Sequence, residues 1–346
     1  MIIQGRYLDG ILRELYTTLV DSTDTFEASK GKGHDLLAPT VILSNPRARI
    51  SSTATRGRLI SALAEFCWYL SGSADLEFIR YYLSRYPPEG ATGLIKEAYG
   101  PRLMGTGHFG QVTNQIERAI DVLRAKPHSR RAVITILQSD DLAIDRKEAP
   151  CTVAIQLIQR RERLHTIAMM RSNDAYLGFP HDVFCFTMIQ ELVARSLGVR
   201  VGEYHHFATS LHLYSDDKEK VTNYIGEGFQ NPTFAMPKMP SGCQLSNLKM
   251  FLAAEKDIRE GRATKASDIT LPTYWRDLAL VLLNFSDKKR QRGEKHSHRN
   301  FSEISDNFYE NFYVKNPTRI KVDAVPASIQ EEFELGINNE QNKRHR

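Results

Sequence analysis

Residues 152–197 read TVAIQLIQRRERLHTIAMMRSNDAYLGFPHDVFCFTMIQELVARSL, and this stretch decides the fold. Two β-like segments, Thr152–Gln159 and Leu164–Met170, are joined by a short charged turn, which predicts adjacent antiparallel strands. After a Gly-Phe-Pro step, residues Asp182–Leu197 keep apolar side chains at helical spacing until Gly198. The stretch therefore predicts two strands, a loop and a buried helix.

The segments on either side extend this pattern. A further β-like segment precedes it at Ala132–Leu137, and helical patterns cover Arg56–Leu70 and Asn114–Arg124. Two more helical patterns follow at Leu248–Glu260 and Pro272–Phe285. We therefore predict an α+β fold, with a mixed, largely antiparallel sheet flanked by helices and a C-terminal helical extension.

The 346 residues are enough for one large domain plus an extension, or for two modest domains. We expect a catalytic domain over residues 1–232, a helical extension over 233–325 packed on it, and a tail over 326–346. The last residues, Asn338 to Arg346, are polar and charged, which is typical of a frayed end.

Composition limits the class of protein. No run reaches the roughly 18 apolar residues of a membrane span, and Met1–Asp9 lacks the features of a signal peptide. We expect a cytoplasmic protein with no membrane partner. The four cysteines are far apart and form no CxxC pair, so we interpret them as reduced thiols.

The net charge of +5 favours anionic partners but falls short of the basic asymmetry of a dedicated nucleic-acid binder. The densest basic run, residues 288–299, lacks interleaved aromatic residues and is typical of a solvated loop. A small phosphorylated substrate fits this charge equally well.

Cys151 follows Pro150 at the start of a β-like segment. A free cysteine is more often a small buried hydrophobic residue than a nucleophile. Here, however, Arg130 and Arg131 lie about twenty residues upstream and Arg171 twenty residues downstream. Guanidinium groups clamp phosphate, and their positive charge stabilises a thiolate. The pattern favours a nucleophilic cysteine acting on a phosphorylated substrate.

Glu65 lies inside the Arg56–Leu70 helix, which is apolar on most sides. Desolvation raises the pKa of such a carboxyl group, which suits it to moving protons near neutral pH. The alternative is a salt bridge on a helix face.

Six segments of the chain, taken together and in order, resemble the thymidylate synthases. They are Glu65 with Trp68, Ala98-Tyr99-Gly100, Ser129-Arg130-Arg131, Ala149-Pro150-Cys151, the run from Arg171 to Pro180, and Leu211-His212-Leu213-Tyr214-Ser215. The resemblance covers roughly residues 1 to 230. It implies that family's homodimer, in which a pair of arginines crosses into the neighbour's active site.

The resemblance also implies roles for individual residues. Cys151 would be the nucleophile, Glu65 the carboxyl group that relays protons, and Tyr99 a neighbour of the C5 proton being removed. The phosphate would be bound by Arg171 and Ser172 and by the partner's Arg130 and Arg131. His212 and Tyr214 would hold the sugar hydroxyl, and Asp174 would contact the ring or the cofactor.

The implied chemistry joins a pyrimidine nucleoside monophosphate to 5,10-methylenetetrahydrofolate. Addition of a thiolate at C6 turns the ring into an enolate or enamine equivalent whose C5 can attack the methylene carbon. Loss of the C5 proton and expulsion of tetrahydrofolate leave an exocyclic methylene group. Hydride from the folate then gives a methyl product, and water gives a hydroxymethyl product.

Asp182 is the most informative departure from the family, which carries asparagine at this position to read uracil. An acidic side chain accepts a hydrogen bond from the N4 amine of cytosine, whereas O4 of uracil is repelled by it. The same exchange marks the deoxycytidylate and cytidylate hydroxymethylases. The alternative is an aspartate that favours a helix start just after Pro180.

Other departures concern the surroundings of the site. Thr152, Met170 and Ser210 replace the family's histidine, glutamine and aspartate, and Lys30 or Lys32 stands where a phosphate-binding arginine is usual. The folate-facing tryptophans and the short apolar C-terminal tail have no counterpart. A looser cofactor lid favours water as the final nucleophile, because hydride transfer needs a dry site.

The preferred hypothesis is 5-hydroxymethylation of CMP or dCMP, with the choice between ribose and deoxyribose left open. The alternatives are a divergent thymidylate synthase that methylates dUMP, and a catalytically inactive nucleotide- or RNA-binding relative. Cys151, Glu65 and the arginines argue against the inactive relative, because a pure binding protein needs no thiol nucleophile. No metal ligands are predicted.

Overall fold

The chain folds around two β-sheets, and the computed structural model describes residues 1–28, 30–84, 86, 93–106, 113–143, 148–230, 234–290 and 301–312. The expected tail and the part of the basic run beyond Arg290 lie outside these residues. Within them, no helix combines the length and apolar character needed to cross a membrane.

The larger sheet has six strands in the order β1-β4-β9-β7-β6-β5. Its strands are β1 (Ile2–Gly5), β4 (Thr40–Leu43), β9 (Arg200–Ala208), β7 (Arg163–Met170), β6 (Thr152–Arg160) and β5 (Val133–Thr135). Strands β1 and β4 are parallel, as are β7 and β9, and the other pairs are antiparallel. The predicted α+β fold with a mixed, largely antiparallel sheet is therefore confirmed.

The β6–β7 hairpin forms where the sequence predicts it. Its turn places Arg161 and Glu162 at φ values of 47° and 57°, the left-handed conformation that matches the twist of a tight hairpin. The register then sets Thr152 opposite Met170 at the open end of the hairpin. This end carries Cys151 and Arg171.

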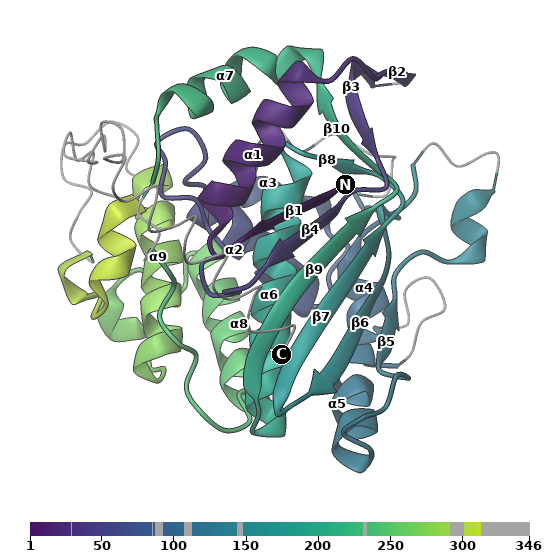
Figure 1. The fold of residues 1–346 in the computed structure, drawn as a ribbon. Coiled ribbons are helices and arrows are strands. Elements are labelled where there is room, and N and C mark those ends of the chain that lie inside the picture. Colours follow the sequence, from purple (N-terminus) through teal and green to yellow (C-terminus); the bar gives the residue numbers. More distant parts are fainter. Residues whose placement is uncertain are drawn as a thin grey trace, which may run out of the picture.

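One face of the six-stranded sheet is covered by α6 (Gly178–Leu197), and the other face is turned to the viewer in Figure 1. Helix α6 is buried from Phe179 to Ala194, except at His181, because α2 (Leu59–Leu70) packs against it from the side away from the sheet. It begins at Gly178, four residues before the predicted start, and ends at Gly198, where φ is +71°.

Helix α2 begins at Leu59 and not at Arg56 as predicted. Residues before it form a turn, in which the Gly57 and Arg56 amides bond to the backbone and side chain of Thr53. Leu59, Leu63, Phe66 and Leu70 of α2 are buried, and the helix stops before Gly72, whose φ is +69°. The predicted end is therefore correct, and the first turn is replaced by a loop.

The smaller sheet has four strands in the order β2-β3-β10-β8. They are β2 (Thr25–Ala28), β3 (Gly31–Leu37), β10 (Ser210–Tyr214) and β8 (Asn173–Asp174). The short β8 pairs in parallel with β10, which sets Asp174 beside His212. This sheet lies next to the open end of the β6–β7 hairpin, because Arg171 connects β7 to β8.

The remaining elements frame the sheets. The α-helices are α1 (Leu8–Asp21), α3 (Leu76–Tyr82), α4 (Tyr99–Met104), α5 (Gln115–Ala125), α7 (Lys218–Gly226), α8 (Leu245–Arg259) and α9 (Thr273–Arg290). Short 3-10 helices are η2 (Ser139–Leu142), η3 (Ser215–Asp217), η4 (Ala266–Asp268), η5 (Phe301–Glu303) and η6 (Asn307–Phe312). Helices α8 and α9 pack on each other and on α2, so the C-terminal part of the described chain extends the core.

A buried ion pair anchors the segment that leads into α2. The Arg49 guanidinium bonds to the Glu191 carboxylate of α6, and both side chains are fully buried. The other oxygen of Glu191 accepts from the Met239 amide at 3.0 Å. One carboxylate thus holds the loop before α2, helix α6 and the segment before α8 together.

Candidate active site

Cys151 lies at the start of β6 and is partly exposed. Its carbonyl oxygen accepts from the Arg171 amide at 2.9 Å. The Arg171 guanidinium folds back over the same loop, and its Nε and Nη2 donate to the carbonyls of Pro150 and Ala149 at 2.9 and 2.7 Å. The hairpin therefore brings Cys151 and Arg171 together, with Ser172 next in the chain.

Burial raises the pKa of the Cys151 thiol above its ordinary value. The positive charges of Arg171 and Lys30 oppose this effect, and the carboxyl groups of Asp182 and Glu148 add to it. The sequence predicted that arginines would stabilise the thiolate. Burial outweighs the two positive charges, since Arg171 also bonds to two carbonyls and Lys30 pairs with Glu148 at 3.0 Å.

The smaller sheet gathers the residues expected to hold the sugar and phosphate. His212 and Tyr214 project from β10 with ring centroids 4.9 Å apart, and Phe26 of β2 packs edge-on against both. Of the two candidate lysines, Lys30 lies in the β2–β3 turn within electrostatic reach of Cys151 and Tyr214. Lys32 lies on β3 opposite Glu27.

Asp35 was missed in the sequence, where nothing marks it. It lies on β3 directly opposite His212 and accepts from the Ser210 hydroxyl at 3.0 Å. Ser210 Oγ in turn lies 3.5 Å from His212 Nδ1. Position 210, where the thymidylate synthases carry an aspartate, thus holds a serine whose hydroxyl donates to the Asp35 carboxylate on the neighbouring strand.

Glu65 and Tyr99 line the side of the site formed by α2 and α4. The Tyr69 hydroxyl donates to Glu65 at 2.8 Å, and burial raises the pKa of Glu65 to about 7. The Tyr99 oxygen accepts from the Thr152 amide at 3.1 Å and lies 3.0 Å from Thr152 Oγ1. Thr152 Oγ1 is also 3.2 Å from the Met170 sulfur, so these two departures from the family contact each other.

Asp182 is buried in α6, and its carboxyl group accepts from Asn173 Nδ2 at 2.8 Å. Burial raises its pKa well above the ordinary value, the Glu65 charge adds to this, and the Asn173 bond opposes it. The helix begins four residues earlier, and the carboxylate bonds a side chain. The alternative of a helix-start residue is therefore wrong for this carboxyl group.

Asp174 turns its carboxylate toward the start of α6, where Oδ1 accepts from the amides of Tyr176 and Leu177 at 2.8 and 3.0 Å. Burial raises the pKa of Asp174, and the two amides oppose that shift. The carboxyl group therefore shapes the loop between β8 and α6, beside His212.

Arg130 and Arg131 are exposed and lie far from their own Cys151. They precede β5, whose Val133 pairs with Gln156 of β6. Because the pairing is antiparallel, Arg131 lies near the far end of β6, about seven residues and roughly 20 Å from Cys151 at the usual rise per strand residue. An arginine side chain does not span that distance.

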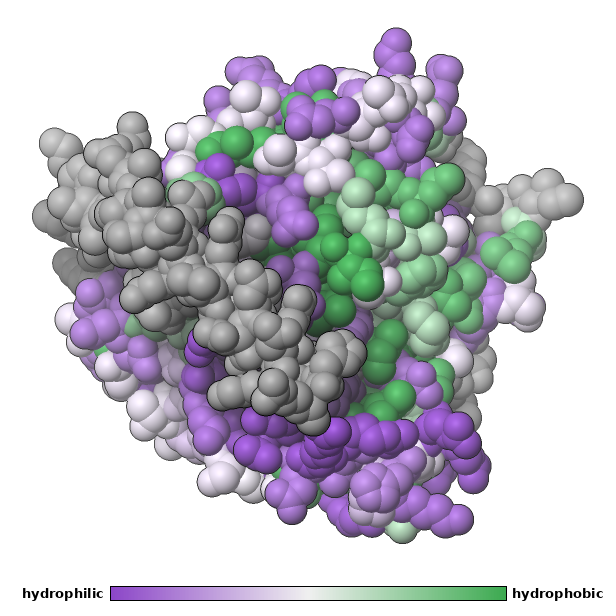
Figure 2. Space-filling model, in the orientation of Figure 1, coloured by the Kyte–Doolittle hydropathy of each residue, from purple (hydrophilic) through white to green (hydrophobic). Residues whose placement is uncertain are grey.

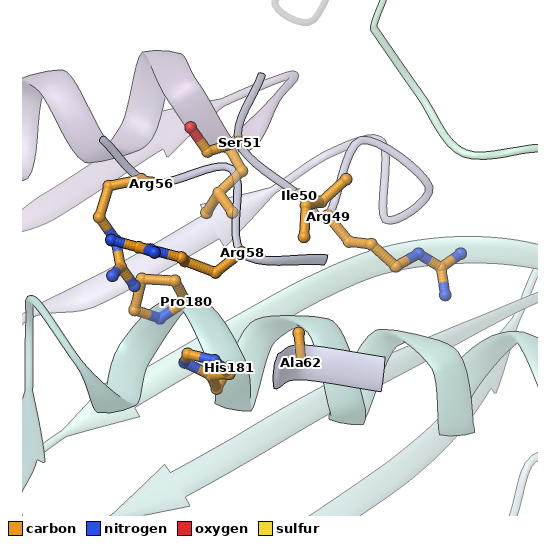
Figure 3. A pocket seen from close by; sticks show the side chains of 9 residues that line it. Arg49, Ile50, Ser51, Arg56, Arg58, Ala62, Pro180 and His181 are labelled. Atoms are coloured by element: carbon orange, nitrogen blue, oxygen red, sulfur yellow. The ribbon is translucent and has the colours of Figure 1, made fainter. Parts of the chain in front are cut away.

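A pocket lies beside the start of α6 and was not predicted. Figure 3 shows Arg56 and Arg58 above Pro180 and His181, while Arg49 extends away toward its partner in α6. The Arg56 guanidinium stacks 4.6 Å from the Tyr176 ring, and its Nε is buried without a hydrogen-bond partner among the described residues.

His181 closes one side of this pocket. Its Nδ1 lies 2.8 Å from the Leu177 carbonyl and its Nε2 lies 2.8 Å from the Ser61 hydroxyl. Burial lowers the pKa of His181 to about 4, and the charges of Arg56 and Arg58 add to the effect. His181 is therefore neutral at pH 7, so the positive charge of the pocket comes from the arginines.

One further group has the donor atoms of a metal site. His165, Glu203 and His205 bring one ligand atom each within 4.8 Å of one another on the open face of the six-stranded sheet. However, Nδ1 of His165 accepts from the Glu203 amide at 3.2 Å, which occupies its lone pair. The cluster lies away from Cys151, at the other end of β7.

Comparison with known proteins agrees with this geometry. Residues 50–270 match the thymidylate synthase family. Deoxyuridylate hydroxymethyltransferase of Bacillus phage SP01 is 30% identical over 227 residues, which are 61% of this chain and 58% of that protein. Thymidylate synthase of Symbiobacterium thermophilum is 30% identical over 173 residues, 46% of this chain and 61% of that protein.

A second phage protein gives a similar match. Deoxyuridylate hydroxymethyltransferase of Delftia phage PhiW-14 is 27% identical over 198 residues, 53% of this chain and 54% of that protein. The chain thus covers less than two thirds of the length of each of these relatives. Since the family match spans more than half of the chain and includes the site around Cys151, this protein belongs to the thymidylate synthase family.

Proposed function

We propose that this protein transfers a one-carbon unit from 5,10-methylenetetrahydrofolate to C5 of CMP or dCMP and forms the 5-hydroxymethyl product. The observation that carries the choice of base is the buried carboxyl group of Asp182, held by Asn173 within electrostatic reach of Cys151 and Glu65. Two relatives named deoxyuridylate hydroxymethyltransferases support the type of transfer.

The reaction begins with bond formation between Cys151 Sγ and C6 of the ring. C5 then attacks the methylene carbon, loses its proton, and expels tetrahydrofolate. Water adds to the exocyclic methylene, the Sγ–C6 bond breaks, and the nucleotide leaves with a hydroxymethyl group. The net change consumes one water and releases tetrahydrofolate.

Glu65 and Tyr99 move the protons of this sequence. A carboxyl group with a pKa of about 7 exchanges a proton readily near neutral pH, and the Tyr69 hydroxyl holds it in place. Tyr99 is fixed by Thr152, the residue after the nucleophile, so its hydroxyl stays close to the ring carbons that react.

The nucleotide lies across the smaller sheet. Its phosphate binds Arg171, Ser172 and Lys30, since a guanidinium and an ammonium group beside the nucleophile suit a dianion. The sugar hydroxyl binds His212 and Tyr214, and Asp174 shapes the loop over the ring.

Asp182 reads the base at position 4. Cytosine carries an amine there, which donates to a carboxyl oxygen whether Asp182 is ionised or protonated. When protonated, Asp182 also donates to N3 of cytosine. Uracil O4 finds a donor only when Asp182 is protonated, so the ionised state selects cytosine.

The folate binds with its anionic end in the pocket of Arg56 and Arg58. Two guanidinium groups fit a carboxylate, and one of them has a buried Nε with no partner in the described part of the chain. The pocket adjoins the loop that starts α6. This arrangement supports binding of the cofactor where the family's tryptophans are missing.

Replacing Arg58 by methionine is therefore expected to raise the KM for methylenetetrahydrofolate by about 10- to 100-fold, the usual value of a hydrogen bond to a charged group. Because Arg58 is exposed, kcat and the KM for the nucleotide should stay near wild type. Arg118→Met, exposed on α5, is the matched control. An unchanged folate KM in steady-state kinetics would count against this pocket.

The active unit is a homodimer joined through the open face of the six-stranded sheet. Because side chains alternate along a strand, one set points away from α6. Its apolar members are Ile2, Ile42, Val133, Val153, Ile158, Ile167, Met169, Val201 and Phe207. Figure 2 shows hydrophobic side chains gathered over these strands, a surface that favours a protein partner.

The position of Arg130 and Arg131 supports the same dimer. Neither reaches its own site, and both lie at the end of β5, on the edge of the open face. The phosphate site of one subunit contains that subunit's own Arg171 and Lys30. A second copy packed on the open face brings Arg130 and Arg131 of the second copy toward this site.

Mixing inactive Cys151→Ser with inactive Arg131→Ala subunits should restore about a quarter of wild-type activity, because random exchange gives half heterodimers with one intact site each. Mixing Cys151→Ser with Glu65→Gln should restore nothing, since both residues belong to one subunit's site. A monomer by sedimentation, or no recovery after verified exchange, would contradict shared sites.

A methylating enzyme that acts on dUMP and a hydroxymethylase that acts on dUMP are the main alternatives, and both kinds of name occur among the relatives. An inactive RNA-binding relative is less well supported. In the described part of the basic run, Lys289 donates to the Tyr81 carbonyl at 2.7 Å and Arg290 pairs with Asp287 at 2.7 Å.

A further inference from the structure

Four buried side chains form one hydrogen-bonded chain that ends on Asp182. The Tyr204 hydroxyl lies 2.8 Å from His206 Nδ1, and His206 Nε2 lies 3.0 Å from Asn173 Oδ1. Asn173 Nδ2 then donates to Asp182 at 2.8 Å. All four residues are at most 7% exposed.

The direction of every bond in this chain follows from the chemistry of its members. Burial lowers the pKa of His206 to about 3, so the ring is neutral and carries one proton. Asn173 uses its nitrogen toward Asp182 and turns its oxygen to His206, so His206 Nε2 must carry that proton. Nδ1 is then an acceptor, and the Tyr204 hydroxyl donates to it.

We propose that Tyr204 and His206 act as positioning residues that fix the Asn173 amide, so that Asp182 always receives a donor and is held as the acceptor that selects cytosine. This inference rests on the proposed function for the choice of base. The position of the Asn173 donor itself rests only on the three hydrogen bonds that join these four side chains.

The surroundings leave little freedom for another arrangement. The His206 ring packs edge-on against Phe179 with centroids 4.9 Å apart and an interplanar angle of 88°. At Gly178, a Cβ atom would lie 3.1 Å from Asn173 Nδ2. The absence of a side chain there therefore leaves room for the amide.

The alternative orientation of the Asn173 amide shows what the hydrogen bonds from Tyr204 and His206 contribute to the choice of base. If His206 did not donate, the amide could rotate and present its oxygen to Asp182, which would then favour the protonated acid. A protonated Asp182 can donate to O4 of uracil. Tyr204 and His206 thus control the base preference without contact to the substrate.

Other charged and titratable groups act on the same carboxyl group. Those within electrostatic reach of Asp182 are Glu65, Tyr69, Tyr99, Cys151, Asp174, Cys185 and Tyr204. Glu65 and Asp174 raise the pKa of Asp182, and the Asn173 donor lowers it. Loss of that donor removes an influence that lowers the pKa of Asp182.

The test compares His206→Phe, which removes both ring nitrogens, with His206→Gln, whose side-chain N–H can replace Nε2–H. The ratio of kcat/KM for the cytosine nucleotide to that for the uracil nucleotide should fall about 10-fold or more in His206→Phe. In His206→Gln it should stay within about threefold of wild type. A substitution that only destabilised the fold would lower kcat/KM for both nucleotides and leave the ratio of the two values unchanged.

A second readout needs no substrate. Infrared difference spectra against Asp182→Asn follow the carboxylate band of Asp182 through a pH titration. The apparent pKa should rise by about one unit in His206→Phe and by less in Tyr204→Phe, where only the outer donor is lost. Tyr204→Phe also serves if His206→Phe does not fold, as judged by thermal denaturation.

The two readouts separate this inference from the proposed function. A raised pKa of Asp182 in an enzyme that prefers uracil would leave the hydrogen-bonded chain standing and refute the cytosine assignment. An unchanged pKa and an unchanged ratio in folded His206→Phe or Tyr204→Phe would overturn the positioning role, whichever base is used.

Discussion

Replacing Cys151 by serine is expected to lower turnover by about 10⁴-fold or more, because the reaction needs a covalent bond to C6 that a serine hydroxyl forms poorly. The thiol lies at the start of β6, with the Arg171 amide on its carbonyl and both Arg171 and Lys30 within electrostatic reach. Nucleotide binding should stay within about threefold of wild type, since the phosphate and sugar ligands remain.

Cys243 provides a matched control for that substitution. It is the exposed cysteine, it lies in the segment before α8, and no role is proposed for it. Cys243→Ser should keep full activity. Undiminished turnover in Cys151→Ser, or an equal loss in both variants, would remove the covalent mechanism.

Replacing Asp182 by asparagine is expected to reverse the preference for the base. The wild-type ratio for cytosine over uracil can reach roughly 10⁴-fold, because a site built around a buried hydrogen bond rejects an analogue that leaves it unpaired. In Asp182→Asn the amide offers a donor to O4 and an acceptor to N3–H, so the uracil nucleotide should become the better substrate.

The variant need not be efficient. Thr152 and Met170 still differ from the uracil-reading pattern, and Asn173 must then bond to an amide instead of a carboxylate. The expected change is therefore in the ratio of kcat/KM values for the two bases. Asp174→Asn is the control, because its carboxylate bonds backbone amides and should affect both bases alike. A ratio unchanged in Asp182→Asn would return Asp182 to a structural role.

The parts of the site that depend on local pattern could be predicted from the sequence. A charged turn between two β-like segments sets Thr152 opposite Met170, and this register places Cys151 beside Arg171. Likewise, one glutamate in an apolar helix has a raised pKa wherever that helix packs, and the pKa of Glu65 is about 7.

The rest depends on contacts between distant segments, which no local pattern shows. Asp35 reaches His212 only because β3 pairs with β10, and His206 reaches Asn173 only because β9 lies beside α6 and β8. The direction of the Cys151 pKa shift also needed the structure. The sequence showed arginines nearby but not the burial that outweighs them.

The start of α2 shows the same limit on a smaller scale. Residues 56–58 continue the helical pattern, yet Thr53 bonds the amides of Gly57 and Arg56 and makes a turn. This turn leaves Arg56 and Arg58 free to line the pocket beside α6.

The most direct test of the central claim is to supply CMP, dCMP, UMP and dUMP separately with 5,10-methylenetetrahydrofolate and to identify both products by mass spectrometry. We predict 5-hydroxymethylcytosine nucleotide formed together with tetrahydrofolate, from CMP or dCMP in preference to either uracil nucleotide. A methylated uracil nucleotide formed with dihydrofolate, or faster turnover of dUMP than of both cytosine nucleotides, would contradict the account.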